Sequence, residues 1–188
     1  MTWNAVVPVK AWRAAKSRLD LPPDSRAAMA RSMTLYVLDL LTTHEDIAHV
    51  VVVTVDADAS REAGARGATV LTEDLGLNDA VRHGCAWIAE HRDDGPTVVV
   101  PADLGFLTVP ALSDALAALA RIGRAHVPDA SGEGTTLLAA PAASAITPFY
   151  GLGSSAAHAK AGFVRVEDVD QVVRTDVDRL EDLEAHSA

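Results

Sequence analysis

Short runs of β-branched and aliphatic residues alternate along this chain with longer segments of helical periodicity. The Val50–Val53 run is continuous, which is typical of parallel strands covered on both faces. We therefore predict an α/β fold with helices on both sides of a mostly parallel central sheet. The predicted strands are Ala5–Val9, Val50–Val55, Thr69–Thr72, Thr97–Val100, Arg124–Val127, Thr136–Ala140 and Phe163–Val166.

Apolar residues spaced about 3.6 positions apart predict helices between these strands. One helix is expected to start from a cap at Asp24 or Ser25 and to bury residues up to Leu41. Two more are expected from Asn78 to Ala89 and over Ala111–Arg121, and an Ala-rich helix is expected to contain His158 and Lys160. The chain shows no repeat and no long linker, so we expect one domain over residues 1–188.

Composition and charge narrow the classes of partner. The chain has 188 residues, of which 49% are hydrophobic and 22% charged, as in an ordinary globular domain. Its formal net charge is −10, and no basic tract occurs, so nucleic acid and anionic membranes are excluded as expected partners. A small anionic ligand is still compatible with this charge, because solvent screens distant charges.

The single cysteine, Cys85, excludes an internal disulfide and favours a reducing compartment. We expect its side chain to fill apolar space in a helix. The first residues lack a signal-peptide pattern, and no apolar run approaches the length of a membrane span. A cytoplasmic location is the expectation.

Carboxylates follow two of the apolar runs at positions where such a sheet binds ligands, beyond the carboxyl ends of its strands. Asp103 ends the segment Val98-Val99-Val100-Pro101-Ala102-Asp103. Asp176 and Asp178 are two positions apart, which places both carboxylates on one side of an extended segment. The three could share a divalent cation, because Mg²⁺ binds one or two carboxylates together with phosphate and water oxygens. Helix capping is the alternative, for Asp103 and for Asp178 before Leu180–Leu183.

Cationic side chains cluster after the first predicted strand. The chain has thirteen arginines and three lysines, and two of the lysines are Lys10 and Lys16, close to Arg18. A lysine ammonium suits phosphate, and an arginine can bind two of its oxygens together. A solvated surface with scattered charges is the alternative.

Two glycine-containing loops complete the candidate chemistry. The loop Asp129–Thr136 combines two glycines with two threonines, and Gly151–Ser155 leads into the Ala-rich helix. Both are candidates for binding an anion through backbone amides and hydroxyls. A plain hairpin turn is the alternative for the first loop, and His158 could simply pack or orient a backbone carbonyl.

The motifs taken together carry a family resemblance. They are Pro8-x-Lys10, Ala15-Lys16-Ser17-Arg18-Leu19, Gly76-Leu77-Asn78, Pro101-Ala102-Asp103-Leu104, Asp129 with Gly132-x-Gly134-Thr135-Thr136, Gly151-x-Gly153-Ser154 with His158, and Asp176-x-Asp178 with Glu181-Asp182-Leu183. Each is weak alone, but their order over nearly the full chain resembles the 2-phospho-L-lactate/phosphoenolpyruvate guanylyltransferases of deazaflavin coenzyme F-420 biosynthesis. The resemblance implies a single-domain nucleotidyltransferase fold, a Rossmann variant similar to glycosyltransferase A.

The resemblance also implies an activity and a set of site residues. The enzyme would join GMP from GTP to the phosphate of phosphoenolpyruvate or 2-phospho-L-lactate and release pyrophosphate. The metal Mg²⁺ would be held by Asp103, Asp176 and Asp178. The triphosphate and its nucleotide would meet Lys10, Lys16, Arg18 and Asn78. The acceptor carboxylate would be held by backbone at Thr135 or Thr136 and Gly151 and by the Ser154 hydroxyl.

The chain departs from the family pattern in three loops. Gly105 and Tyr150 stand where Pro and Phe are usual, and Arg179-Leu180 stands where Thr-Pro is common. These departures bear on affinity and substrate preference. Phosphoenolpyruvate is the favoured acceptor, because the Ala- and Arg-rich composition resembles the actinobacterial branch; 3-phosphoglycerate presents the same pair of charges.

Other nucleotide-binding proteins are the alternatives. Gly151–Ala156 matches a dinucleotide fingerprint, but Pro148 interrupts the lead-in, so we reject an NAD enzyme. A sugar transferase could use Asp176-x-Asp178 as its metal motif. A molybdopterin guanylyltransferase normally has a Gly-rich first loop, which Pro8-Val9-Lys10 lacks. A non-catalytic nucleotide-binding protein would need no metal cluster.

Overall fold

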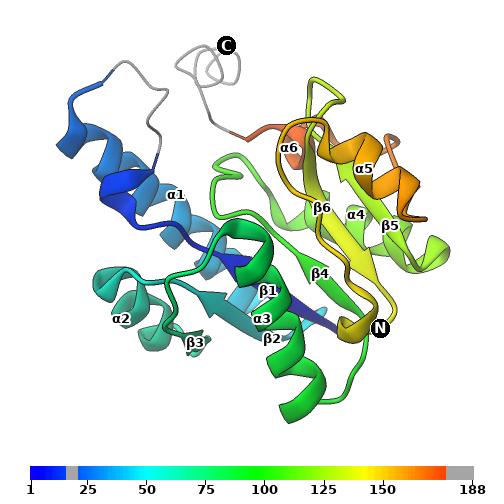
Figure 1. Ribbon diagram of the computed structural model, residues 1–188, viewed down its shortest axis with the longest axis horizontal. Helices are drawn as coiled ribbons and strands as arrows, with labels where there is room; N and C mark the ends of the chain where they lie inside the picture. Colours follow the sequence, from blue (N-terminus) through cyan, green and yellow to red (C-terminus); the bar gives the residue numbers. More distant parts are fainter. Residues whose placement is uncertain (16–20, 177–188) are drawn as a thin grey trace.

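The computed structural model of the protein describes residues 1–15 and 21–176. Within these residues, seven strands form one sheet in the order β3-β2-β1-β4-β6-β5-β7 (Figure 1). The strands are β1 (Trp3–Pro8), β2 (Ile47–Val53), β3 (Thr69–Leu71), β4 (Thr97–Val99), β5 (Ala125–Pro128), β6 (Thr135–Ala140) and β7 (Val164–Arg165). All seven overlap the predicted strands, which confirms the apolar runs as sheet.

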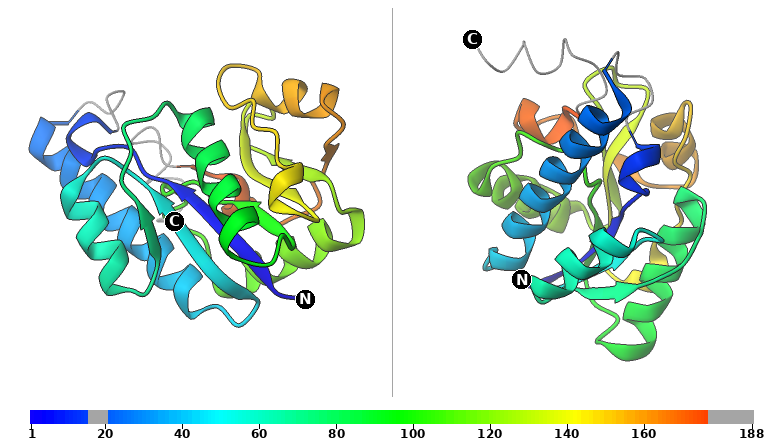
Figure 2. Two further views of the ribbon diagram at one scale, coloured as in Figure 1. Left: turned by 60° about the horizontal axis from the view of Figure 1, so that its bottom comes forward. Right: turned by 90° about the vertical axis from the view of Figure 1, so that its left-hand side faces the viewer.

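Helices cover both sides of this sheet. The α-helices are α1 (Pro23–Thr43), α2 (Ala57–Ala65), α3 (Leu77–His91), α4 (Val109–Ile122), α5 (Ser154–Lys160) and α6 (Gln171–Arg174), with short 3₁₀ helices η1 (Trp12–Ala14) and η2 (Ala143–Ala145). Side chains of α1, α2, α4 and α6 pack in one core, and those of α3 and η2 pack in another. Figure 2 shows α1, α4 and α6 on one side of the sheet and α3 and α5 on the other.

The period of two along β1 creates the two cores. Ala5, Val7 and Val9 belong to the core under α1 and α4, whereas Val6 belongs to the core under α3. The pattern confirms the prediction that Val-rich strands are covered on both faces.

Strand β1 pairs in parallel with β2 and β4, and β2 pairs in parallel with β3. Strand β6 is antiparallel to both of its neighbours, β4 and β5, while β5 is parallel to β7. The described sheet is therefore mostly parallel, as predicted. In the sheet, β2 and β3 lie on one side of β1, whereas β4, the next strand along the chain, lies on the other side of β1. This reversal creates a topological switch point between β1 and β4.

Helix α2 was not predicted from the sequence. Its buried residues are alanines, Ala59 and Ala63, so it carries little apolar periodicity. The Asp56 carboxylate caps it by accepting from the backbone N–H groups of Asp58 and Ala59.

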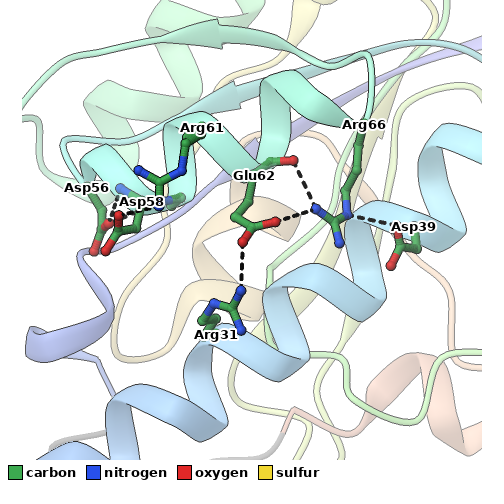
Figure 3. A network of polar contacts seen from close by, with 8 residues as sticks. Arg31, Asp39, Asp56, Asp58, Arg61, Glu62 and Arg66 are labelled. Carbon is green, nitrogen blue, oxygen red and sulfur yellow. Dashed lines mark hydrogen bonds and ion pairs between the residues drawn. The ribbon is translucent and has the colours of Figure 1, made fainter.

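Ion pairs join α2 to α1 (Figure 3). Arg31 donates to Glu62 over 2.6 Å, and Arg66 pairs with both Glu62 and Asp39 over 2.8 and 2.7 Å. Hydrogen bonds from Arg31 and Arg66 lower the pKa of Glu62. The paired side chains lie at the surface and are between 22% and 61% exposed, so we assign them a role in orienting the helices and little net stability.

The predicted cap of α1 is wrong. Pro22 is the N-cap residue of this helix, and no side chain makes a capping hydrogen bond. Pro23 at the first helical position fixes the backbone angle that the helix needs, and proline has no N–H that would require a cap. Asp24 lies inside the first turn instead.

The described elements from Trp3 to Arg174 belong to one sheet and its covering helices. The predicted domain over residues 1–188 also includes residues outside the described part, so its bounds stay a prediction. No helix in the described part has the length and apolar character that a membrane crossing requires.

Candidate active site

A cleft of about 670 Å³ lies at the carboxyl ends of β1, β2 and β4. It coincides with the topological switch point of the sheet, where open α/β sheets bind their ligands. The segments that line it are those that follow these strands, together with η1, two residues of α1 and the start of α3. The lining residues are Pro8–Trp12, Ala14, Ala15, Ala30, Thr34, Val53–Val55, Glu73–Leu77, Ala80 and Pro101–Asp103.

Two of the predicted site residues, Lys10 and Asp103, line this cleft. Lys10 is exposed two residues after the end of β1, and Asp103 is partly exposed four residues after the end of β4. Because β1 and β4 are parallel neighbours, their ends place a cation and a carboxylate at the same edge of the sheet. The cleft therefore offers charges of both signs beside apolar walls.

Trp12 fixes the segment that follows Lys10. Its side chain is 6% exposed, and its indole N–H donates to Thr34 Oγ1 over 3.1 Å. Its backbone N–H donates to the Asp56 carboxylate, the cap of α2, over 3.0 Å. This anchor was not predicted from the sequence, although a tryptophan close to Lys10 was the available signal.

A second group of predicted site residues meets at the start of β6. Ser154 Oγ donates to Thr135 Oγ1 over 3.2 Å, and Thr135 Oγ1 lies 2.9 Å from His158 Nδ1. Strand β6 is antiparallel to β4, and Val99, the last residue of β4, pairs with Leu138. Residues 135–137 of β6 therefore extend past the carboxyl end of β4. Thr135 therefore lies at the same edge of the sheet as the cleft, although it is not one of the cleft's lining residues.

The other predicted acceptor contacts differ in exposure. Thr136 is 2% exposed, and its hydroxyl donates to the Val127 carbonyl over 3.4 Å. Gly151 is exposed, with a φ of 137° that favours glycine. The 129–134 loop is the turn of the β5–β6 hairpin, which was the alternative interpretation of that motif.

Asn78 joins α3 to the loop before α5. Its side-chain oxygen accepts from the Tyr150 backbone N–H over 2.7 Å, and its side-chain nitrogen donates to the Tyr150 carbonyl over 3.0 Å. Both polar ends of the amide thus bond to the protein. The predicted contact of Asn78 with the nucleotide stays a prediction.

Lys16, Arg18 and Asp178 lie outside the described residues, so their predicted roles stay predictions. Asp176 is partly exposed and is the last residue of the described part. Among the described residues, no three His, Cys, Asp or Glu side chains are grouped to hold a metal ion. That finding leaves open the predicted set of Asp103, Asp176 and Asp178, because it does not include Asp178.

Burial shifts the pKa values of several titratable groups near these segments, among them His158 and Cys85. Desolvation and, to a smaller extent, the charge of the neighbouring His126 lower the pKa of His158 to about 4. The His158 ring is therefore neutral at pH 7. Desolvation raises the pKa of Cys85 to about 12, so its thiol is protonated and inert as a nucleophile. The prediction that Cys85 fills apolar space in a helix is confirmed.

Residues 3–184 match the family described as guanylyl transferase, CofC-like. The chain belongs to this guanylyltransferase family. It is 40% identical to the phosphoenolpyruvate guanylyltransferase of Streptomyces coelicolor over 189 residues, which cover 97% of this chain and 89% of that protein. It is 33% identical to phosphoenolpyruvate guanylyltransferase 2 of Rhodococcus jostii, over 97% of this chain and 83% of that protein.

Solved structures confirm the nucleotidyltransferase fold. A protein assigned as a nucleotide-diphospho-sugar transferase from Desulfovibrio desulfuricans G20 superposes with a TM-score of 0.74 at 17% identity, covering 98% of this chain and 86% of that one. A 4-diphosphocytidyl-2C-methyl-D-erythritol synthase superposes with a TM-score of 0.62 at 19% identity, covering 98% and 95% of the two chains. At these identities the likeness bears on the fold alone.

Proposed function

We propose that this guanylyltransferase joins GMP from GTP to the phosphate of phosphoenolpyruvate and releases pyrophosphate, as a step of coenzyme F-420 biosynthesis. The observation that carries the proposal is the 40% identity, over 97% of the chain, to a relative named for that reaction. The cleft supports it, because Lys10 and Asp103 both line it, beyond the carboxyl ends of adjacent strands.

GTP would occupy the cleft between β1 and the loop before α3. Apolar side chains such as Val55, Leu75 and Leu77 line that part and would pack against the base. Lys10 lies where the triphosphate would enter, and Lys16 and Arg18 would add cationic contacts from the adjoining segment.

We also propose a Mg²⁺ ion held by Asp103, Asp176 and Asp178. The carboxylate that Asp103 brings to the cleft fits this hard cation, which shares its coordination shell with phosphate and water. When bound, the ion would neutralise phosphate charge and help to align the reacting groups.

The chain need not supply a nucleophile for this reaction. The acceptor phosphate itself attacks the α-phosphorus of GTP, and pyrophosphate leaves. The protein must bring two polyanions together, although two unit charges 4 Å apart repel by about 4 kcal/mol at an effective dielectric near 20. Lys10, Lys16 and Arg18 reduce this repulsion, and positioning then accounts for the rate. We assign no general base.

The acceptor would lie beside β6, at the edge that the cleft shares with Thr135. Its carboxylate would be held by Thr135 or Thr136, Gly151 and Ser154.

The lone buried Cys85 supports a reducing compartment, and the cytoplasm is the location we propose.

Pyrophosphate release tests the proposal. Purified protein is incubated with Mg²⁺, GTP and, in turn, phosphoenolpyruvate, 2-phospho-L-lactate or 3-phosphoglycerate, with ATP in place of GTP as the donor control. We expect the highest kcat/KM with GTP and phosphoenolpyruvate. Equal or higher kcat/KM with another acceptor would overturn the assignment of phosphoenolpyruvate, and GTP binding without turnover would favour a non-catalytic protein.

A further inference from the structure

Thr135, Ser154 and His158 form a chain of polar side chains with a graded exposure. His158 is fully buried, Ser154 is 2% exposed, and Thr135 is partly exposed. Both Ser154 Oγ and His158 Nδ1 lie within hydrogen-bond distance of Thr135 Oγ1, at 3.2 and 2.9 Å. Thr135 is therefore the member of this group that is placed to meet a ligand, with the other two behind it.

The backbone fixes the tautomer of His158. The Phe149 N–H donates to His158 Nε2 over 2.9 Å, and a backbone N–H can only donate. Nε2 must then carry no proton. Because burial keeps the ring neutral at pH 7, its proton is on Nδ1, and Nδ1–H donates to Thr135 Oγ1.

Because Nδ1–H is the donor in this bond, the Thr135 hydroxyl oxygen accepts from His158. A hydroxyl accepts two hydrogen bonds and donates one. His158 and Ser154 supply the two that Thr135 accepts, so its own hydrogen is left to donate to a third group. An anionic oxygen is the strongest acceptor for such a hydroxyl. With the other His158 tautomer, Thr135 would have to donate to the ring instead.

We propose that His158 is a positioning residue of the acceptor site, which holds the Thr135 hydroxyl as a donor to the acceptor carboxylate. The inference rests on the proposed function and deepens it. It moves the direct side-chain contact from the Ser154 hydroxyl, to which the resemblance assigned it, to the Thr135 hydroxyl, and it places Ser154, whose hydroxyl donates to Thr135, behind that contact.

Packing explains the burial of His158 but not this direction of hydrogen bonding. The rings of Phe149, Tyr150 and Phe163 lie 6.1, 5.2 and 5.8 Å from the His158 ring, centroid to centroid. A role in packing alone predicts that changes at His158 lower stability and leave the ratio of the two substrate KM values unchanged. The experiment therefore measures KM for both substrates.

The first variants change Thr135. Thr135→Val keeps the shape of the side chain and removes the hydroxyl, and Thr135→Ser restores a hydroxyl. We expect Thr135→Val to raise the phosphoenolpyruvate KM by about tenfold, as expected for one hydrogen bond to a charged group, with GTP KM within about twofold of wild type. Thr135→Ser should return the acceptor KM to within about threefold.

The second variants separate the two nitrogens of His158. An asparagine amide can take the place of Nδ1, and a glutamine amide can take the place of Nε2. His158→Asn should keep the donor to Thr135 and an acceptor KM near that of wild type. His158→Gln should keep the partner of Phe149 and raise the acceptor KM by about tenfold. In a Thr135→Val background, His158→Gln should add no further increase.

Ser113→Ala is the matched control. Ser113 lies on α4, away from the acceptor segments, and its hydroxyl lies 3.0 Å from Nε2 of another buried histidine, His44. Its loss should lower stability and leave the acceptor KM within about twofold of wild type.

The outcomes separate the two proposals. A wild-type protein that does not use phosphoenolpyruvate overturns the proposed function. A wild-type protein that does use it, with Thr135→Val at the wild-type acceptor KM, overturns the role of Thr135 and His158, whether or not the His158 variants fold. Equal changes in both KM values for His158→Gln also overturn it. A selective rise in the acceptor KM supports it.

Discussion

At the scale of single residues, the side chains of Lys10 and Asp103 both line the cleft, and the sequence predicted that they would belong to the site. Each follows an apolar run that was recognisable as a strand, so its place at a sheet edge followed from the pattern. The bonds of Asn78 to Tyr150 and of His158 to Thr135 could not be predicted, because they join segments distant in sequence. Periodicity reports burial and does not report partners.

The carboxylate of Asp103 is the group whose removal should matter most for turnover. Asp103→Asn removes its charge from the cleft, and we expect kcat to fall by at least about a hundredfold with the circular dichroism spectrum unchanged. Asp114→Asn, at an exposed position on α4, is the control and should keep wild-type kcat. Wild-type turnover in Asp103→Asn would refute the role of this carboxylate.

The buried imidazole of His158 should make stability depend on pH. Its pKa is about 4 in the folded protein, below its ordinary value of 6.5, so between these values the unfolded chain binds a proton that the folded chain excludes. Stability is then complete above pH 6.5 and falls as the pH drops toward 4. From about pH 7.5 to about pH 5 the loss through this group is about 2 kcal/mol.

Urea unfolding at these two pH values measures the loss. His158→Gln should lose less stability than wild type over the same interval. Burial also lowers the pKa of the neighbouring His126, so part of the pH dependence should remain in the variant. Identical losses in the two proteins would contradict the assignment to His158.

At the scale of helices and strands, the sequence predicted the elements whose buried side chains are large. Helices α1, α3 and α4 carry buried leucine, valine or isoleucine at helical spacing. Helix α2 was not predicted, because its buried residues are alanines and alanine contributes little to an apolar pattern. Its capping residue, Asp56, was visible in the sequence. The cap of α1 was predicted wrongly because Asp24 and Ser25 follow a proline that itself begins the helix.

Close packing of α3 on the sheet gives a test at this scale. A Cβ added at Gly84 would lie 2.7 Å from Val6 Cγ1 and 3.2 Å from Val53 Cγ2, so Gly84→Ala should destabilise the fold by about 1–3 kcal/mol. Gly64 of α2 has open space around it, and Gly64→Ala should leave stability unchanged or raise it by up to about 1 kcal/mol. Chemical denaturation compares the two, and equal effects would contradict the packing described for α3.

At the scale of the whole molecule, the order of the strands brings the two proposed substrate sides to one edge of the sheet. Parallel β1, β2 and β4 end at the cleft, and antiparallel β6 begins beside the end of β4, which places Thr135 at the same edge. The sequence predicted a mostly parallel sheet but not the place of β6, because an apolar run does not specify its neighbours or its direction. The antiparallel insertion therefore brings Thr135, the proposed acceptor contact, to the same edge as the cleft proposed for GTP.

The chemical structure of the reaction product gives the strictest test of guanylyl transfer to phosphoenolpyruvate. After incubation of the protein with Mg²⁺, GTP and phosphoenolpyruvate, ³¹P NMR and mass spectrometry should show one guanylyl group bonded through its phosphorus to the acceptor phosphate. The two phosphorus signals of that diphosphate should be coupled, and free pyrophosphate should form in equal amount. Unchanged GTP, or GDP and free phosphate in place of the coupled diphosphate, would contradict the proposed transfer.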